Sequence, residues 1–427
     1  MKKFLADELT KCKMQDSQHA TVPLLPELNR HNSAGTTSFL KTIFNGLNAL
    51  SGLGILSVPY ALSSGGWLSL ILMIIIAATT FYTGLLIKRC MEDDPCIRSY
   101  PDIGYKAFGS TGRLIISILM NLELYLVATG SLILLGDNLH RLLPNVEIHV
   151  YGDIVIGGRQ SLVLLVAIVM MPTVWIDNMS TLSYVSATGV FTSLVILGSI
   201  LWLGVSVDGI GLQHKGVLFD WNGLPTAFSL YTFCFCSHAV FPTLYSSMWN
   251  PRQFSFALLL CFMLCTVVIA SMAILGYLMF GSDLQSQITL NLPTDRMSAK
   301  VAVYTALLNP IAKYGLTLKP TVDSIENHFK WLRENRSRSL FMRTALVGSS
   351  VVLALMLPFF GHLMSLAGSL FGVPTSILLP CFCYLKISGA YKRIGVESAV
   401  IVFAVSMGIV ILVFGTYTSV LQIVYNL

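Results

Sequence analysis

Long apolar stretches separated by short polar segments dominate the chain. Runs of about 20 apolar residues recur, which is the length that an α-helix needs to cross the hydrocarbon core of a bilayer. They cover residues 40–62, 67–87, 114–139, 160–174, 182–206, 225–247, 254–280, 299–318, 341–358, 362–385 and 398–424. The pattern predicts an all-α polytopic membrane protein with 11 transmembrane helices, preceded by a polar cytosolic tail at residues 1–37.

Composition supports this class of protein. Hydrophobic residues make up 54% of the chain and charged residues only 11%, whereas about 25% of a soluble domain is charged. A chain so poor in charge cannot form a water-covered surface, which excludes a soluble enzyme. The sequence also has no His-Glu-x-x-His, no phosphate-binding glycine loop with a lysine and no Gly-x-Ser-x-Gly elbow. We therefore expect no catalytic residues and no cofactor.

The nine cysteines lie in the apolar spans or in the basic segments expected in the cytosol. Apolar surroundings oppose the charged thiolates that a zinc site needs. We expect no metal site and no disulfide framework, with the cysteines acting as small buried hydrophobic residues.

Basic residues set the expected orientation. If the N-terminus is cytosolic, the cytosolic segments hold 21 of the 27 lysines and arginines and the opposite side holds 5. Lysine and arginine favour the cytosolic side, so the pattern predicts a lumenal C-terminus. The sequons at Asn178 and Asn335 fall on the cytosolic side and should carry no glycan. The charge lies at membrane flanks rather than on one basic face, so no nucleic-acid partner is expected.

Two of the spans contain residues that interrupt a helix. The first span includes LNALSGLGILSVPYAL at residues 47–62, and the sixth includes YTFCFCSHAVFPTLY at residues 231–245. Unpaired backbone groups cost several kcal/mol each in lipid, so a break persists only where it lines a cavity or contacts protein. We expect the amides of residues 52–55, at the positive end of the restarted helix, to bind a small carboxylate. The alternative is close helix packing by small residues.

The two interrupted spans open two halves of the chain. Interrupted helices at matching positions of two halves indicate a transport site near the bilayer midplane. The span order predicts a five-plus-five inverted repeat, with the first repeat at about 38–206, the second at about 225–385 and an eleventh helix at about 398–424.

Four motifs carry a resemblance to a known family. FNGLNALSGLGILSVPYAL, FCFCSHAVFPTLYSSM, LLNPIAKYGLTLKP and LMSLAGSLFGVPTSILLPCFCYLKI resemble the amino acid/auxin permease family (AAAP) over nearly the whole chain from residue 38. The most similar branch is that of the vacuolar amino acid transporters (AVT), which is related to the vesicular inhibitory amino acid transporters.

The resemblance implies a LeuT-like fold of the APC superfamily, with ten core helices plus one. It also implies secondary active, proton-coupled transport of amino acids by alternating access across the vacuolar or another acidic endomembrane. Two alternatives remain open: a plasma-membrane amino acid or auxin importer, and an amino acid sensor with the same fold. A channel is a poorer alternative, because the chain has no repeated pore-lining motif or ring of like charge.

The resemblance also implies site residues. The substrate's carboxylate and amino groups would bind at the first break, with Ser237 at the second. The residues concerned at the first break are Leu50, Ser51, Gly52, Leu53 and Gly54. Asn48, one turn before the break, and Thr317 in the eighth span correspond to positions that hold sodium in sodium-coupled members. Sodium is a less expected coupling ion here than the proton.

Three ionisable side chains lie within predicted spans: Glu123, His238 and Lys313. Such residues are costly in a bilayer and usually face a cavity or a partner. We expect one of them to carry the coupled proton, because burial favours a neutral carboxyl group and histidine titrates near neutral pH. The alternative is a structural role in which Glu123 pairs with Lys313 or with a nearby polar group and holds helices together.

Overall fold

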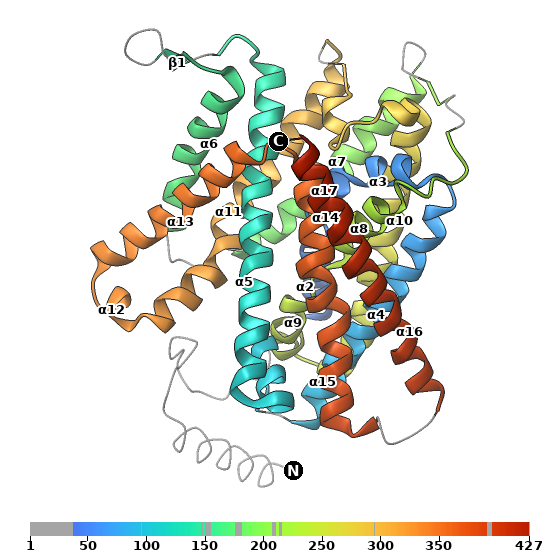
Figure 1. Cartoon of the computed structure of the whole chain (residues 1–427), viewed down its shortest axis with the longest axis vertical. Helices are drawn as coiled ribbons and strands as arrows, with labels where there is room; N and C mark the ends of the chain where they lie inside the picture. Colours follow the sequence, from blue (N-terminus) through green and yellow to red (C-terminus); the bar gives the residue numbers. More distant parts are fainter. Residues whose placement is uncertain are drawn as a thin grey trace.

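The computed structural model of the chain describes residues 37–94, 96–146, 148–149, 155–175, 182–206, 211–212, 216–293, 295–390 and 395–426. The tail predicted at residues 1–37, apart from Thr37, and the sequon at Asn178 lie outside these residues. The described residues form a bundle in which most of the long helices follow the long axis of the molecule (Figure 1).

The elements follow one another along the chain as helices, short 3₁₀ or π segments (η) and one pair of strands. They are α2 (Phe39–Leu50), η1 (Leu53–Leu56), α3 (Val58–Gly65), α4 (Ser69–Asp93), α5 (Tyr100–Leu142), β1 (Ile148–His149), β2 (Val155–Ile156), α6 (Gly158–Trp175), α7 (Leu182–Val205), α8 (Leu224–Phe235), η3 (His238–Val240), α9 (Phe241–Ser247), η4 (Pro251–Gln253), α10 (Phe254–Phe280), η5 (Gly281–Asp283), η6 (Ile288–Leu290), α11 (Met297–His328), α12 (Lys330–Arg333), α13 (Arg336–Met356), α14 (Phe360–Leu366), η7 (Ala367–Gly372), η8 (Pro374–Leu378), α15 (Leu379–Ser388), α16 (Val396–Val410), η10 (Ile411–Gly415) and α17 (Thr416–Asn426).

Eight helical segments of the described chain are long and apolar enough to cross a membrane. They are α4, α5, α6, α8 to α9, α10 with its flanking turns, α13, α14 to α15, and α16 to α17. This confirms the prediction of a helical polytopic membrane protein. The strands β1 and β2 form only a two-residue antiparallel pair between α5 and α6.

The three other predicted spans also correspond to helices. The first is divided between α2 and α3 by a break. The fifth is α7, of which residues 189–205 are an apolar helix with described side chains. The eighth is α11, which carries charged residues and two internal prolines. The count of 11 spans therefore stays a prediction.

Helix α5 begins earlier than the sequence pattern predicted. Residues 100–108 form a helical segment before the predicted span at 114–139, and Gly109 separates the two parts with a φ of 68°. A capping box starts this segment, since Ser99 and Asp102 exchange hydrogen bonds. Buried and exposed residues alternate with a helical period along residues 100–108, so this segment is amphipathic. Its hydropathy is too low to be recognised as part of a transmembrane span.

The two interrupted helices lie side by side in opposite directions. At one end of the pair, Thr37 exchanges main-chain hydrogen bonds with the segment after α9, through Ser247 and Trp249. At the other end, the amide of Asp220, just before α8, donates to the carbonyl of Gly65 at the end of α3 (3.2 Å). The start of each interrupted helix therefore lies near the end of the other, which is the relation expected between the first helices of two inverted halves.

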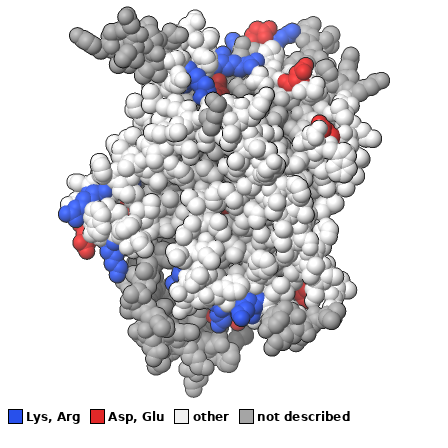
Figure 2. Space-filling view, viewed as in Figure 1, with Lys and Arg blue, Asp and Glu red and all other residues white. Residues whose placement is uncertain are grey.

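The outer surface fits a lipid environment. Figure 2 shows charged side chains toward the two ends of the visible face and in one group at its left edge, near α12, with a largely uncharged surface between them. The exposed side of the last helices is strongly apolar, with Val402, Phe403, Val413 and Phe414 all more than half exposed. An apolar surface of this extent is stable when it faces lipid.

Most of the cysteines behave as expected. Seven of them, all buried or partly buried, are free thiols. Cys96 departs from the expectation, because it is disulfide-bonded.

Candidate functional site

The predicted break in the first span is present. Helix α2 ends at Leu50, and Gly52 is extended, with φ −95° and ψ −158°. The chain restarts as the 3₁₀ turn η1 and continues as α3. Glycine is permissive here, and a Cβ added to Gly52 would meet no atom of the described residues within 4 Å. The break therefore has free space beside its extended residue.

Only some of the main-chain amides at this break are free to bind a carboxylate, whereas the sequence predicts this role for all of residues 52–55. The N–H of Gly52 donates to the carbonyl of Leu50 (3.0 Å), so the expectation that this amide is available to a ligand is wrong. Leu53 and Gly54 open the 3₁₀ turn, and the first amides of such a turn have no acceptor inside it. The first amide available to a ligand is therefore that of Leu53, because the amide of Gly52 is hydrogen-bonded at the end of α2.

The second break lies against the first. Helix α8 ends at Phe235, and the chain restarts at η3 after Cys236 and Ser237. The hydroxyl of Ser237 donates to the carbonyl of Ala49 in α2 (2.9 Å). Gly54 approaches α8 so closely that an added Cβ would lie 3.3 Å from the Cα of Cys234. Both breaks therefore share one centre, as the sequence predicted.

Lys313 of α11 reaches the first break. Its ammonium group donates to the main-chain carbonyls of Asn48 (3.1 Å) and Ser51 (3.2 Å). The last carbonyls of a helix lack partners within the helix and form its negative end, so this ammonium group closes the end of α2. Gly189 of α7 makes room for it, since an added Cβ there would lie 2.8 Å from the Lys313 Nζ. The position predicted for an ion is held by a side-chain cation.

Three predicted residues lie near this lysine, and each makes a different contact. The side-chain oxygen of Asn48 is buried without a hydrogen-bond partner in the part of the chain that the structure describes. The hydroxyl of Ser51 bonds to that of Ser193 in α7. The hydroxyl of Thr317 donates to the carbonyl of Lys313 in its own helix (3.0 Å). No hydrogen bond joins Thr317 to Asn48 in the described part of the chain, and the role of this pair stays a prediction.

Glu123 lies on the other side of the breaks. It is partly buried in α5, and its carboxylate accepts a hydrogen bond from the hydroxyl of Thr375 in η8 (2.8 Å). Lys313 is bound at the end of α2, so Glu123 does not pair with Lys313 in this structure. The hydroxyl partner of Glu123, Thr375, is instead a nearby polar group of the kind that the structural alternative also allowed.

His238 is almost completely buried, with 2% of its surface exposed. Its Nε2 lies 3.0 Å from the carbonyl of Thr80 and 3.0 Å from the hydroxyl of Thr83, both in α4. A carbonyl only accepts, so Nε2 carries the proton in the neutral ring. The other ring nitrogen, Nδ1, is buried and has no hydrogen-bond partner among the described residues. A buried, unpaired acceptor is costly, and it is also the atom at which this ring takes up a proton.

A run of polar groups links His238 to the region of Glu123. The hydroxyl of Thr83 donates to the carbonyl of Ser376 (2.6 Å), the residue after Thr375. Segments η7 and η8 are π-helical, and such segments recur at functional sites. The sequence analysis did not select Thr83, Thr375 or Ser376. The visible signal was a group of hydroxyl residues in otherwise apolar spans, at ATTFYTG and GVPTS.

Comparison with known proteins agrees with this architecture. A helical membrane protein with two interrupted helices around a shared centre belongs to the transporter class. Residues 35–421 match the family described as transmembrane amino acid transporter protein. The chain therefore belongs to this family, which confirms the resemblance to the amino acid/auxin permeases.

Individual relatives are similar over almost the whole chain. Amino acid transporter AVT1J of Arabidopsis thaliana is 56% identical over 398 residues, which cover 93% of this chain and 94% of the relative. Amino acid transporter AVT1I of the same plant is 54% identical over 402 residues, covering 93% and 98%. Amino acid transporter AVT1D is 40% identical over 384 residues, covering 90% and 70%. The chain is thus an integral membrane protein of a transporter family rather than an enzyme.

Proposed function

We propose that this protein is a secondary active transporter that couples the movement of amino acids to protons by alternating access. The substrate's carboxylate binds at the amides of Leu53 and Gly54, which open η1 at the positive end of a restarted helix. The remaining predicted groups, Leu50, Ser51 and Ser237, border the same break. The free space beside Gly52 supports this position for the substrate backbone.

The proposed fold is LeuT-like, with 11 spans. Its first repeat runs from α2 to α7, its second from α8 to α15, and its eleventh helix is α16 with α17. The opposed directions of the two interrupted helices support this organisation, because an inverted repeat places its first helices in that relation.

The observation that carries proton coupling is the position of the Lys313 ammonium group. In transporters with interrupted helices, the carbonyls at the end of a half-helix coordinate the coupling cation. Here those carbonyls, at Asn48 and Ser51, already bind the Nζ of Lys313. The lysine side chain cannot dissociate as a bound metal ion would, but its ammonium group can release a proton. Loss of that proton removes the positive charge from the end of α2, which alters the stability of the break.

Glu123 and His238 are the other candidate proton carriers. Each lies on a helix or turn that borders the breaks, and the hydroxyl groups of Thr83 and Thr375 connect their surroundings. The unpartnered Nδ1 of His238 is a ready acceptor. Protonation of either side chain would change hydrogen bonds between α4, α5 and η8.

The proposed location is the vacuolar or another acidic endomembrane, with a cytosolic N-terminus and a lumenal C-terminus. The excess of basic residues in the predicted cytosolic segments supports the orientation. The resemblance to vacuolar transporters supports the compartment, and localisation of a tagged protein distinguishes it from the plasma membrane.

Uptake into proteoliposomes tests this function. The full chain is reconstituted, and accumulation of labelled neutral amino acids is measured under an imposed pH gradient or sodium gradient. We expect accumulation driven by the pH gradient, abolished by a protonophore and insensitive to sodium. Sodium-driven uptake without pH dependence would overturn proton coupling. Absence of uptake by folded protein under either gradient would favour the sensor.

A matched pair of lysine variants tests the proposed coupling residue. Lys313→Gln removes the charge from the break, and Lys300→Gln changes an exposed lysine of the same helix. Loss of a charge-assisted hydrogen bond corresponds to a fall of about tenfold or more in gradient-driven uptake. Lys300→Gln should transport normally. Full coupling in Lys313→Gln would remove this lysine from the mechanism.

A further inference from the structure

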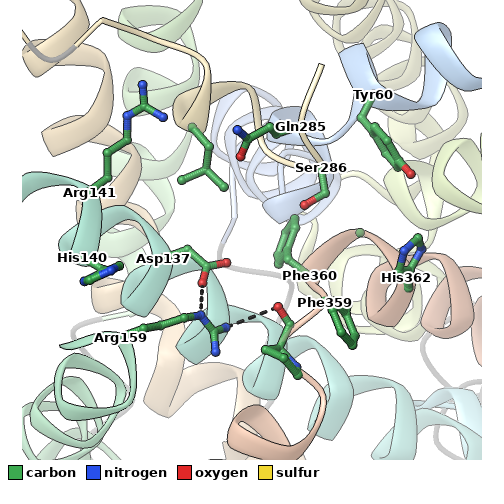
Figure 3. Close-up of a pocket in the computed structure, with 13 residues that line it drawn as sticks. Tyr60, Asp137, His140, Arg141, Arg159, Gln285, Ser286, Phe359, Phe360 and His362 are labelled. Atoms are coloured by element: carbon green, nitrogen blue, oxygen red, sulfur yellow. Dashed lines mark hydrogen bonds and ion pairs between the residues drawn. The ribbon is translucent and has the colours of Figure 1, made fainter. Parts of the chain in front are cut away.

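A cavity lined by charged, polar and aromatic side chains lies away from the two breaks. It has a volume of about 510 Å³, within the range of small-molecule sites. Its walls come from the end of α5, the start of α6, the segment between η5 and η6, the start of α14, and Tyr60 of α3. Figure 3 shows Arg141 on one side of this cavity, Tyr60 and His362 on the other, and the Asp137–Arg159 pair between them. We name this space the vestibule.

Three charged side chains line the vestibule, and two of them neutralise each other. Arg159 Nε donates to the carboxylate of Asp137 (2.6 Å), and another of its nitrogens donates to the carbonyl of Pro358 (3.3 Å). The second oxygen of Asp137 accepts from the side-chain amide of Gln287 (2.9 Å). Asp137 and Arg159 are therefore committed to holding α5, α6 and the segment before α14 together.

Arg141 is the uncompensated charge. One of its terminal nitrogens donates to the carbonyl of Leu292 (2.7 Å), but its Nε is buried and has no hydrogen-bond partner in the described chain. No ion pair of Arg141 occurs among the described residues. A buried guanidinium donor without an acceptor is costly, and a planar carboxylate is the group that matches guanidinium geometry.

The opposite wall suits an apolar group. Phe359 and Phe360 line it beside Tyr60, and the Nδ1 of His362 there is buried without a partner in the described residues. A ligand that places a carboxylate at Arg141 would therefore direct an apolar body toward these rings. Free amino acids with apolar side chains have this combination, and so do simple monocarboxylates.

The vestibule is also connected to the first break. Tyr60 belongs to α3, the half-helix that follows η1, and it packs beside Gly361 at the start of α14. A ligand in the vestibule therefore touches the helix whose start forms the proposed central site.

We propose that the vestibule is a second binding site for a carboxylate-bearing ligand, an apolar amino acid, with Arg141 binding the carboxylate. This inference rests on the proposed transport function, since the ligand is of the class carried through the centre. In the predicted orientation, the vestibule faces the lumen, where it would hold an amino acid before uptake from the lumen or after release into it.

Binding measurements with three related probes test the chemistry. Purified full-length protein is titrated calorimetrically with leucine, with N-acetyl-leucine, which keeps only the carboxylate, and with leucinamide, which keeps only the amine. We expect leucine and N-acetyl-leucine to bind at the vestibule and leucinamide not to bind. Equal binding of acetate or chloride would reduce the site to a non-selective anion site and overturn the proposal, as would binding of leucinamide alone.

Arginine variants locate the site. Arg141→Gln should weaken N-acetyl-leucine binding about tenfold, the value of one charge-assisted hydrogen bond, whereas Arg141→Lys should retain part of it. Arg296→Gln, at an exposed arginine paired with Asp295, is the matched control and should bind normally. Unchanged binding in folded Arg141→Gln would overturn the vestibule assignment.

Transport assays keep this proposal separate from the central function. Lys313→Gln should lower gradient-driven uptake by about tenfold or more while N-acetyl-leucine still binds. Arg141→Gln should raise the KM for uptake of an apolar amino acid without abolishing transport. If the wild type transports amino acids but binds no N-acetyl-leucine, only the vestibule proposal fails. If N-acetyl-leucine binds through Arg141 and no amino acid is transported, only the transport function fails.

Discussion

At the scale of single residues, the two glycines of the first break have different neighbours. Gly54 is packed against α8, where an added Cβ would lie 2.5 Å from the Sγ of Cys234 and 3.3 Å from the ring of Phe233. Gly52 has no such neighbour within 4 Å in the part of the chain that the structure describes. We therefore expect Gly54 to be required for helix packing and Gly52 to be required for substrate binding.

Gly54→Ala should therefore destabilise the fold. Overpacking of a well-filled region costs about 1–3 kcal/mol, which a thermal-unfolding assay in detergent detects as a lowered Tm. Cys234→Ala removes the Sγ in the way, so the double variant should recover part of the loss. Equal Tm values for Gly54→Ala and the wild type would contradict the close approach of η1 to α8.

Gly52→Ala should instead leave the stability unchanged and impair transport. Its φ of −95° is accessible to alanine and the space beside it is free, so the Tm should stay near that of the wild type. The added methyl group would occupy the space proposed for the substrate backbone, and uptake should fall by about tenfold, in the range of a misplaced substrate. Normal transport by this variant would remove Gly52 from the proposed binding site.

At the scale of elements, the hydroxyl of Thr83 joins α4 to η3 and η8. It donates to the carbonyl of Ser376 and accepts from His238. Thr83→Val leaves buried polar groups without a partner, at a cost of about 1–3 kcal/mol. Among the described residues, Thr79 of the same helix bonds only to the carbonyl of Ile75 in its own helix, so Thr79→Val is the matched control. We expect Thr83→Val to lower both the Tm and proton-coupled uptake, and Thr79→Val to change neither by a comparable amount.

A buried ion pair joins α11 to α13. Arg343 and Glu326 are 3% and 8% exposed, and the Arg343 Nε donates to the Glu326 carboxylate (3.0 Å). Arg343→Met would leave Glu326 as a buried unpaired charge, which costs about 3–5 kcal/mol. Denaturation should show that loss, and Glu326→Gln in the same protein should restore part of it. Arg333→Met, at an exposed position, should leave the stability unchanged.

The sequence predicted elements better than contacts between them. The spans could be located because a bilayer requires about 20 apolar residues per helix, and the breaks because glycine and proline clusters interrupt helices. The helical segment before Gly109 was missed because it is amphipathic rather than apolar. The contact of Lys313 with α2 depends on the register between helices 265 residues apart, which no local pattern specifies. Thr83 and Ser376 were missed for the same reason, since most hydroxyl groups in spans bond to their own helix.

At the scale of the whole molecule, the opposed interrupted helices indicate two inverted halves, and the uneven distribution of basic residues predicts how they are oriented in the membrane. The two halves meet at a shared centre formed by the breaks. The predicted cytosolic segments hold most of the lysines and arginines, whereas Arg141 and Arg159 belong to the vestibule at the predicted lumenal end. Figure 1 places the C-terminus at the same end of the molecule as β1, which follows α5. Orientation thus decides which compartment the vestibule faces.

Glycosylation of a full-length tagged protein tests that orientation. The native sequon at Asn335, which caps the start of α13, should remain unmodified because the segment between α11 and α13 is predicted to be cytosolic. A sequon carried on a flexible extension after Leu427 should be glycosylated, because the C-terminus is predicted to be lumenal. An endoglycosidase-sensitive shift in gel mobility measures both, and Asn335→Gln in the extended protein is the control that assigns the glycan. A glycan at Asn335 with none on the extension would contradict the predicted orientation, and Arg141 would then face the cytosol rather than the lumen.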